Sequence, residues 1–514
     1  IFSKYFIKRK IQHGIPGALY AISRNNGIIR PHNTYSSIIG SALTVGFGGS
    51  VGLEGPTVAT GAAIGSRIGK WLHLNYKQLT LLLGCACSGA MSAIFNAPIA
   101  GIIFALEVIM LDLKMSSMVP LLLASASSAL SSYLFLGQDV FYSFELQEPF
   151  FLADIPLYIL LGIATGLISV YFTKMYIGIT NFFEKMSDWR EKLLIGSLSL
   201  GILIFLFPSL YGEGYHSVNS CLHGEFEHLF NNTLFASLKE NMFAIIIVLF
   251  VIVFTKVIAT SVTFAAGGVG GIFAPTLFTG ANLGLLFSKT INWLGISSIS
   301  ESNFAMVGMA GLIAGVLHAP LTSIFLIAEI SSGYELFLPL MVVAAISYAT
   351  TKIFVKHSVY TYQLAERGDL ITHDKDKAIL SMMKVEKLLE NNFCPVRPDA
   401  ALGDLVNTIS KSSRNCFPVV NEDGILEGIV YLDHIRHIIF KPELYDTITV
   451  RNLMVGVQEH VEISDSMEQV AETFQNSSMY NLPVLDKGKY CGFVSRANVF
   501  SSYRRRLKYF SQDD

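Results

Sequence analysis

Long runs of apolar residues constrain the fold of this chain more than any other feature of its sequence. The segments "FAIIIVLFVIVF" (residues 243–254) and "LLIGSLSLGILIFLFP" (residues 193–208) contain no charged side chain. In the hydrocarbon core of a bilayer, such segments satisfy their backbone polar groups only as helices. Of the 514 residues, 15% are charged, against about 25% in soluble domains. Because similar runs recur up to about Val355, we predict a multi-pass α-helical membrane protein.

The apolar character ends near Tyr360, which divides the chain into two modules. The first residues already resemble the flank of a membrane helix, so we expect earlier helices to be missing from this sequence. The neighbouring cluster Lys8, Arg9 and Lys10 favours a cytosolic face at that flank. The predicted parts are a membrane domain at residues 1–367, a charged linker at 368–381, and two small domains at 382–445 and 446–507.

Charge and cysteine usage argue against two kinds of partner. A formal net charge of −2 gives no electrostatic reason to expect a nucleic acid. The six cysteines contain no CxxC pair, and Cys85 and Cys87 lie in an apolar segment. We therefore interpret the cysteines as small hydrophobic residues rather than as metal ligands or disulfide partners.

The membrane module contains an internal repeat. The segment "GGSVGLEGPTVATGAAIG" (residues 48–65) matches "GGVGGIFAPTLFTGANLG" (residues 267–284) at nine of eighteen positions, at an offset of 219 residues. A second pair, "FNAPIAGIIFALE" and "LHAPLTSIFLIAE", ends at Glu107 and Glu329, at an offset of 222 residues. Two matches in the same order predict a duplicated membrane fold, of the inverted-repeat type with broken helices that meet near the bilayer midplane.

Each Gly-rich segment is followed by a proline, Pro56 or Pro275. Glycines let the backbone approach a ligand, and proline is tolerated in the first turn of a helix because no N–H is lost there. Two exposed helix starts with their N–H groups would favour an anion. The alternative is that the glycines only permit close helix packing, as small residues do in membranes. For the two clusters together, we favour an anion site.

The repeat distinguishes Glu54 from two other carboxylates of the membrane module. Glu107 and Glu329 occupy equivalent positions, so we expect both to accept hydrogen bonds from a helix or loop end. Glu54 has no counterpart, because Phe273 stands at the equivalent position. A carboxylate within a bilayer is costly and is a functional candidate by default. We expect Glu54 to sit in the anion site as a tethered anion that leaves when protonated or displaced; the alternative is an N-cap or packing role.

These motifs resemble the CLC family of chloride channels and chloride/proton antiporters. "GLEGP" (residues 52–56) is similar to the family's G-[RK]-E-G-P motif with Leu53 in the basic position, "GGIFAP" (residues 270–275) to its G-x-F-x-P segment, and "HGIP" (residues 13–16) to the end of its G-S-G-I-P segment. The resemblance covers about residues 1 to 367. It implies a homodimer in a cell membrane, with one inverted-repeat chloride pathway in each subunit.

The resemblance also implies roles for single residues. Glu54 would be the gating glutamate, and the amides of Ile272 and Phe273 would coordinate the central anion. Tyr360 would supply a hydroxyl donor, although Tyr362 is close in sequence and an interfacial tyrosine is the alternative. The full set implied to bind chloride is His13, Gly14, Leu53, Gly55, Ile272, Phe273 and Tyr360.

Two positions depart from the family pattern. His13 replaces the serine whose hydroxyl would touch the anion, so an imidazole N–H or backbone amides alone would serve there. Val108 follows Glu107 where the antiporters usually have a second glutamate that passes protons, and valine cannot carry a proton. We therefore favour passive chloride conduction, through a channel or an uncoupled pathway. The alternative is a chloride/proton antiporter with another internal proton route.

The second module also repeats. "NCFPVVNEDGILEGIVYLDHI" (residues 415–435) resembles "YNLPVLDKGKYCGFVSRANV" (residues 480–499), each with a Pro-Val strand, a turn and a Gly-initiated strand that runs into a helix. These segments resemble a tandem pair of CBS domains, which in such a protein would lie in the cytosol. Such pairs often hold adenine nucleotides, for which the second copy offers Ser495 and Asn498, while the first has Tyr431 and His434. The alternative is a platform for dimerisation and coupling.

Two other classes of protein are disfavoured. An intramembrane metalloprotease would need HExxH or another set of convergent metal ligands, and a CBS-linked cation channel would need several pore carboxylates. The membrane module offers paired Gly-Pro helix starts and few acids. We predict a transport protein without enzymatic activity, metal site or required cofactor, with chloride as the transported ligand.

Overall fold

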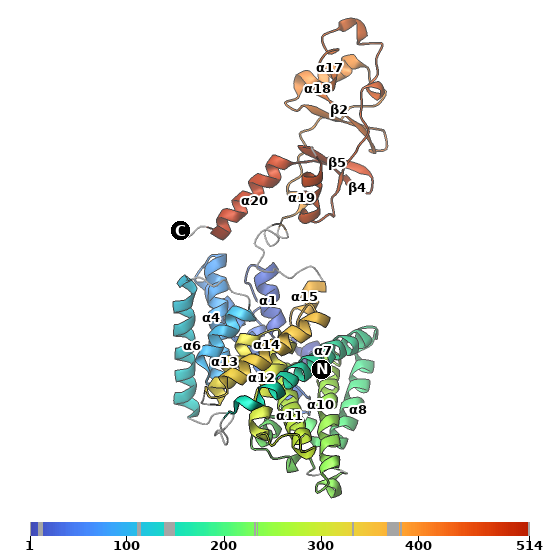
Figure 1. Ribbon diagram of the computed structural model, residues 1–514. Coiled ribbons are helices and arrows are strands. Elements are labelled where there is room, and N and C mark those ends of the chain that lie inside the picture. Colours follow the sequence, from blue (N-terminus) through green and yellow to red (C-terminus); the bar gives the residue numbers. More distant parts are fainter. Residues whose placement is uncertain are drawn as a thin grey trace. The chain divides into compact units, whose positions relative to one another are not determined.

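The computed structural model describes residues 2–8, 14–109, 115–137, 150–230, 233, 235–331, 334–366, 380, 383–477 and 479–511. The chain separates into two compact units, residues 1–370 and 371–514 (Figure 1). The predicted linker lies almost entirely outside the described residues, so its limits and those of the domains beside it stay a prediction.

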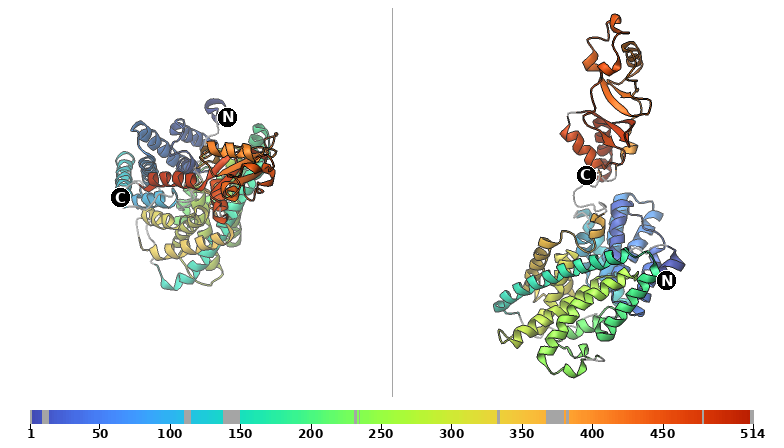
Figure 2. Two further views of the ribbon diagram at one scale, coloured as in Figure 1. Left: turned by 90° about the horizontal axis from the view of Figure 1, so that it is seen from above. Right: turned by 90° about the vertical axis from the view of Figure 1, so that its right-hand side faces the viewer.

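The regular elements in the described part of the first unit are helices, and Figure 2 shows these packed helices from two further directions. Its first half contains α1 (Gly14–Arg24), α2 (Asn33–Gly46), α3 (Glu54–Trp71), α4 (Tyr76–Phe95), α5 (Pro98–Glu107) and α6 (Met115–Leu136). Its second half contains α7 (Ile155–Glu184), α8 (Trp189–Leu206), α9 (Tyr215–Leu222), α10 (Met242–Ala265), α11 (Phe273–Trp293), α12 (Glu301–Leu317), α13 (Pro320–Ile330), α14 (Phe337–Phe354) and α15 (Tyr362–Glu366).

Helix length confirms the predicted membrane module. Five described helical segments are long and apolar enough to cross a membrane, and the most apolar of them, α10, has a mean hydropathy of 2.9. The helices α5, α12 and α13 are apolar but have only 10 to 17 residues. The module therefore combines full spans with shorter helices, as expected for a fold built from interrupted helices.

The ends of the short helices follow from local sequence. Helices α4 and α12 both end at a residue in the left-handed conformation, Asn96 (φ 51°) and His318 (φ 57°). An Ala-Pro pair follows each of them, and Pro98 and Pro320 open α5 and α13. Proline fits the first helical position because no N–H is lost there. The second repeat predicted from the sequence thus has the same backbone plan in both copies.

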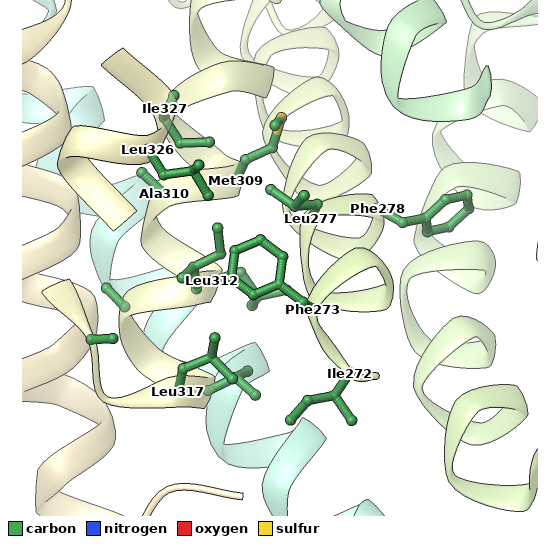
Figure 3. Packing of buried hydrophobic residues seen from close by; sticks show 14 of the residues in the cluster. Ile272, Phe273, Leu277, Phe278, Met309, Ala310, Leu312, Leu317, Leu326 and Ile327 are labelled. Atoms are coloured by element: carbon green, nitrogen blue, oxygen red, sulfur yellow. The ribbon is translucent and has the colours of Figure 1, made fainter. Parts of the chain in front are cut away.

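Close packing explains some of the glycines. A Cβ at Gly280 of α11 would lie 2.7 Å from the carbonyl oxygen of Gly308 in α12, so the two helices touch through their backbones. The packing interpretation is therefore correct at this helix pair. Figure 3 shows the apolar cluster around the start of α11, in which Phe273, Leu277, Leu312 and Leu326 come together from α11, α12 and α13.

The second unit contains two copies of a small α/β motif. In the first copy β1 (Cys416–Val420) pairs antiparallel with β2 (Leu426–Tyr431), and in the second β4 (Asn481–Asp486) pairs antiparallel with β5 (Lys489–Ser495). The short strand β3 (Val461–Glu462) adds to β4 in parallel. The helices are α17 (Leu402–Lys411), α18 (Leu432–Ile435), α19 (Met467–Asn476) and α20 (Arg496–Ser511). The predicted strand–turn–strand–helix repeat is confirmed.

One detail of that prediction was wrong. The glycines do not begin the second strands, because Gly428 lies inside β2 and Gly492 inside β5. Each glycine instead allows another backbone segment to pass close to its strand. A Cβ at Gly428 would lie 2.8 Å from the carbonyl oxygen of Val455, and one at Gly492 would lie 2.9 Å from that of Glu390. Glycine inside a strand often marks such an approach.

Candidate anion pathway

The two Gly-rich segments of the membrane module meet backbone to backbone. The Gly52 N–H donates to the Gly271 oxygen at 2.8 Å, and the Gly271 N–H donates to the Gly52 oxygen at 2.7 Å. A Cβ at Gly55 would lie 3.0 Å from the Gly271 Cα, so this contact requires glycine. Residues 219 positions apart thus bring the starts of α3 and α11 together, as the repeat predicts.

Equivalent hydrogen bonds hold both helix starts. The carbonyl oxygen of Leu53 accepts from the N–H of Thr57 at 3.0 Å and from its hydroxyl at 2.9 Å. The carbonyl oxygen of Ile272 accepts from the N–H of Thr276 at 3.0 Å and from its hydroxyl at 2.7 Å. The N–H groups in the first turn of a helix have no partner within that helix. The positive ends of two helix dipoles are therefore fixed in one place.

The loops before these helices cross over to the opposite copy. The Ser50 N–H donates to the Thr263 hydroxyl oxygen at 3.2 Å, and the Val269 N–H donates to the Thr44 hydroxyl oxygen at 3.0 Å. Thr44 and Thr263 are themselves 219 positions apart, as are Ser50 and Val269. Each loop is thus held by a threonine of the other repeat, and neither helix start can shift alone.

The paired carboxylates Glu107 and Glu329 hold the second set of helix starts. Glu107 accepts hydrogen bonds from the N–H groups of Leu321 (3.1 Å) and Thr322 (2.7 Å), at the start of α13. Glu329 accepts from the N–H groups of Ile99 (3.0 Å) and Ala100 (2.7 Å), at the start of α5. The expectation that both serve the fold by binding a helix end is confirmed.

A small cavity lies beside the paired helix starts. Its volume is about 20 Å³, and its described lining includes Gly14, Gly55, Ile272 and Tyr360. The Tyr360 hydroxyl is buried, and among the described residues it has no hydrogen-bond partner. Tyr362 instead begins α15, so the geometry favours Tyr360 over Tyr362 as the hydroxyl at this cavity. Four of the residues predicted to bind chloride thus come together here.

Glu54 is buried at the paired helix starts. Its side chain is 2% exposed, and its carboxylate faces the backbone N–H of Ala274 in the first turn of α11. It lines a larger cavity of about 570 Å³, together with Leu53 and Thr57. Glu54 opens α3 directly before Gly55, which lines the smaller cavity. Its carboxylate lies beside Gly52, and a Cβ on that glycine would collide with it. The role of Glu54 as a tethered anion in the anion site stays a prediction.

The remaining predicted residues are distributed as follows. Leu53 lines the larger cavity with Glu54 rather than the smaller one. Phe273 is 1% exposed and packs its ring against Phe95, with the ring centroids 5.4 Å apart. Only its backbone at the start of α11 remains suited to an anion. His13 lies outside the described residues.

Val108 follows the last residue of α5 and is 6% exposed. It belongs to the main apolar cluster of the membrane module. The position where antiporters of the resembled family usually carry a proton-transfer glutamate is therefore occupied by a buried hydrocarbon side chain, which offers no site for a proton.

The comparison with protein families decides the family. The model for the voltage gated chloride channel family matches residues 1–352, and the model for CBS domains matches residues 385–441 and 450–505. The chain belongs to the CLC family of voltage-gated chloride channels. This is a family of channels and transporters rather than of enzymes.

Relatives of this CLC protein occur in bacteria and plants. It is 29% identical over 377 residues to a ClcB-like protein of Ralstonia nicotianae, covering 71% of this chain and 82% of that protein. It is 27% identical over 370 residues to the H(+)/Cl(-) exchange transporter ClcA of Vibrio cholerae, covering 70% of this chain and 72% of that protein. The chain spans 56% of the length of the chloride channel protein CLC-f of Arabidopsis thaliana.

Solved structures share the fold. A slow cyanobacterial Cl-/H+ antiporter matches with a TM-score of 0.61 at 22% identity, covering 72% of this chain and 84% of that one. A eukaryotic CLC transporter matches with a TM-score of 0.54 at 17% identity, covering 95% of this chain and 85% of that one. The CLC fold with its CBS pair is therefore shown.

The predicted nucleotide residues of the CBS pair already have partners inside the domain. The Ser495 hydroxyl donates to a carboxylate oxygen of Glu390, and Arg414 donates to the other oxygen of that carboxylate at 2.6 Å. The Asn498 side-chain amide donates to the carbonyl oxygen of Leu388 at 3.2 Å. A phosphate at Ser495 would have to displace a carboxylate.

Sequence reasoning missed two charged residues beside the larger cavity, Glu213 and Lys256. Glu213 lines that cavity together with Glu54. Lys256 lies in α10, is 0% exposed, and donates to the carbonyl oxygens of Leu210 at 3.3 Å and Gly212 at 3.0 Å. A lysine inside the apolar run of α10 and a glutamate between two glycines in "YGEGY" were the signals that could have identified them.

Proposed function

We propose that this CLC protein conducts chloride across a membrane through the pathway at the starts of α3 and α11, with Glu54 as its gate. The observation that carries the proposal is the mutual pairing of Gly52 and Gly271, which brings two helix starts together. The buried Tyr360 hydroxyl beside them has no hydrogen-bond partner among the described residues. N–H groups and a hydroxyl are hydrogen-bond donors, and the helix dipoles add a positive potential. Such a site binds an anion without fixed positive side chains.

Glu54 suits the role of gate because of its place. It lines the larger cavity and directly precedes Gly55, which lines the small one. Its carboxylate faces the backbone N–H of Ala274 at the start of α11, where an anion would compete with it. In its charged form it competes with an anion for the helix starts, and in its protonated form it does not. Chloride would pass when Glu54 is neutral or displaced.

The pathway is proposed to be passive. Val108 provides no proton acceptor at the position that the family's antiporters use, and it lies among apolar side chains. A chloride/proton antiporter is the second candidate, because the Vibrio cholerae relative is an H(+)/Cl(-) exchange transporter. In that case a group other than residue 108 would pass the proton.

The assembly and location are proposed from the family. We place two subunits in a cell membrane as a homodimer, each with its own pathway, and the CBS pair in the cytosol. The predicted domain limits, 1–367, 382–445 and 446–507, are retained for this arrangement, and His13 is retained as a proposed chloride ligand.

A reversal-potential measurement separates the two candidates. The full chain is reconstituted in liposomes with a chloride gradient, and the voltage at which net flux vanishes is measured with and without an opposing pH gradient. We expect reversal at the chloride equilibrium potential in both conditions. A reversal potential that moves with the pH gradient would establish proton coupling and reject the passive pathway.

For the CBS pair, we propose a platform for dimerisation and coupling, with adenine nucleotide binding at Ser495 and Asn498 as the second candidate. The support is the occupation of Ser495 by the Glu390 carboxylate. Calorimetry of the full chain with ATP, ADP and AMP is expected to show no binding. Binding that is lost in Ser495→Ala and retained in Ser477→Ala, a control at the end of α19, would favour the nucleotide site.

A further inference from the structure

The loop that carries Glu213 is built to hold this side chain at the larger cavity. Gly212 (φ 62°) and Gly214 (φ 90°) flank it, and both have the left-handed backbone that favours glycine. The hydroxyl of the preceding Tyr211 donates to the carbonyl oxygen of Gly46 at 2.9 Å, which ties the loop to the end of α2. Glu213 is thus placed by an anchored turn rather than by a long surface loop.

Lys256 secures the same loop from the other side. Its ammonium group donates to the carbonyl oxygens of Leu210 and Gly212, and it lies 4.7 Å from the centre of the Phe278 ring. It also interacts electrostatically with Glu213. A lysine buried this completely is costly unless it is paired. The fold therefore buries the amine of Lys256 next to the acid.

The carboxylate of Glu213 lies at the start of α3. It faces the backbone N–H of Leu53, the residue before the first helical position. The charged and titratable groups that face it from the surrounding described elements are Glu54 of α3, Tyr215 of α9 and Lys256 of α10. Two carboxylates thus line one cavity, and Glu213 lies at the start of α3.

We infer that Glu213 is a second carboxylate that controls access to the anion pathway. An anion that enters the larger cavity is repelled by Glu213, or must displace its side chain, before it reaches Glu54. The inference rests on the proposed chloride pathway and adds a residue that controls access to it. A negative charge on Glu213 in a confined cavity lowers the local concentration of a mobile anion. The hydrogen bonds of Lys256 to Leu210 and Gly212 keep the loop that carries Glu213 in place.

The test measures how chloride flux depends on chloride concentration, applied to each side of the membrane separately. Glu213→Gln keeps the shape of the side chain and removes its charge. We expect the half-saturating chloride concentration on the cavity side to fall about threefold to tenfold, and that on the opposite side to stay unchanged. The matched control is Glu227→Gln, an exposed carboxylate in the described segment that follows α9, which is expected to behave as the wild type.

Two further variants, Glu213→Asp and Glu54→Gln, separate the effect of the Glu213 charge from the effects of loop geometry and of the gate. Glu213→Asp keeps the charge, so we expect its half-saturating chloride concentration to stay close to that of the wild type. Equal changes of this concentration in Glu213→Asp and Glu213→Gln would show that loop geometry matters rather than charge, and would overturn the inference. Wild-type behaviour of Glu213→Gln, while Glu54→Gln opens the pathway, would also overturn it and leave the proposed function intact. Absence of chloride flux in both the wild type and Glu54→Gln would instead reject the proposed function.

Discussion

The starts of α3 and α11 share a backbone but differ in the side chain at the first helical position. Both begin after a Gly-rich loop, both carry a threonine that bonds back to the residue before the helix, and the two loops pair through Gly52 and Gly271. The first copy has Glu54, which faces a cavity of about 570 Å³. The second has Phe273, whose ring is buried against Phe95. In the proposed pathway, the residues that the two copies share build the anion site, and Glu54, which they do not share, is its gate.

The largest effect should come from breaking the backbone contact between the copies. A side chain at Gly271 would meet the Gly55 N at 2.8 Å, so Gly271→Val must push the two helix starts apart. We expect the folding free energy to fall by about 1–3 kcal/mol and chloride flux to fall by about an order of magnitude, because the ligand groups lose their alignment. Flux assays in liposomes measure this.

The control for this variant is Gly46→Val. Gly46 ends α2, and a Cβ there meets nothing within 4 Å. Flux near the wild-type level in Gly271→Val would mean that the helix starts do not need to touch.

A smaller effect on stability should distinguish the paired carboxylates Glu107 and Glu329. Both hold a helix start, but Glu107 also accepts a hydrogen bond from the Thr322 hydroxyl at 2.7 Å. We expect Glu107→Gln to cost about 2 kcal/mol and Glu329→Gln somewhat less, because hydrogen bonds to a charged group are lost. Thermal unfolding in detergent would measure both variants. A larger loss in Glu329→Gln would contradict the assigned contacts.

The smallest effect should come from the threonine hydroxyls. In Thr57→Val and Thr276→Val, the carbonyl oxygen before each helix keeps its bond from the backbone N–H. We expect each variant to lose about 1 kcal/mol or less and to retain flux. If Thr57→Val alone abolished flux, the Thr57 hydroxyl, which lines the larger cavity, would have a direct part in conduction.

Sequence alone predicted the parts of the site that depend on local patterns. The glycines and prolines of the two repeats fixed where α3 and α11 begin, and the equal offsets indicated that these starts are equivalent. The roles of Glu107 and Glu329 followed from the same equivalence. Each of these inferences needs only residue type, spacing and the known geometry of helix ends.

Long-range contacts were not predictable in this way. The direction of the Glu54 side chain depends on the shape of two cavities, and the partnership of Lys256 with the loop at Gly212 joins residues 44 positions apart. The Glu390 carboxylate that occupies Ser495 comes from 105 positions away. No local periodicity reports such pairs, and only the packed fold brings them together.

The most direct test of the gate is chloride flux through Glu54→Gln, with Phe273→Leu as the control at the equivalent position of the second copy. Glutamine imitates the protonated state, so we expect an open pathway whose flux no longer changes with pH, while Phe273→Leu keeps wild-type pH dependence. Unchanged, still pH-gated flux in Glu54→Gln would contradict the assignment of Glu54 as the gate.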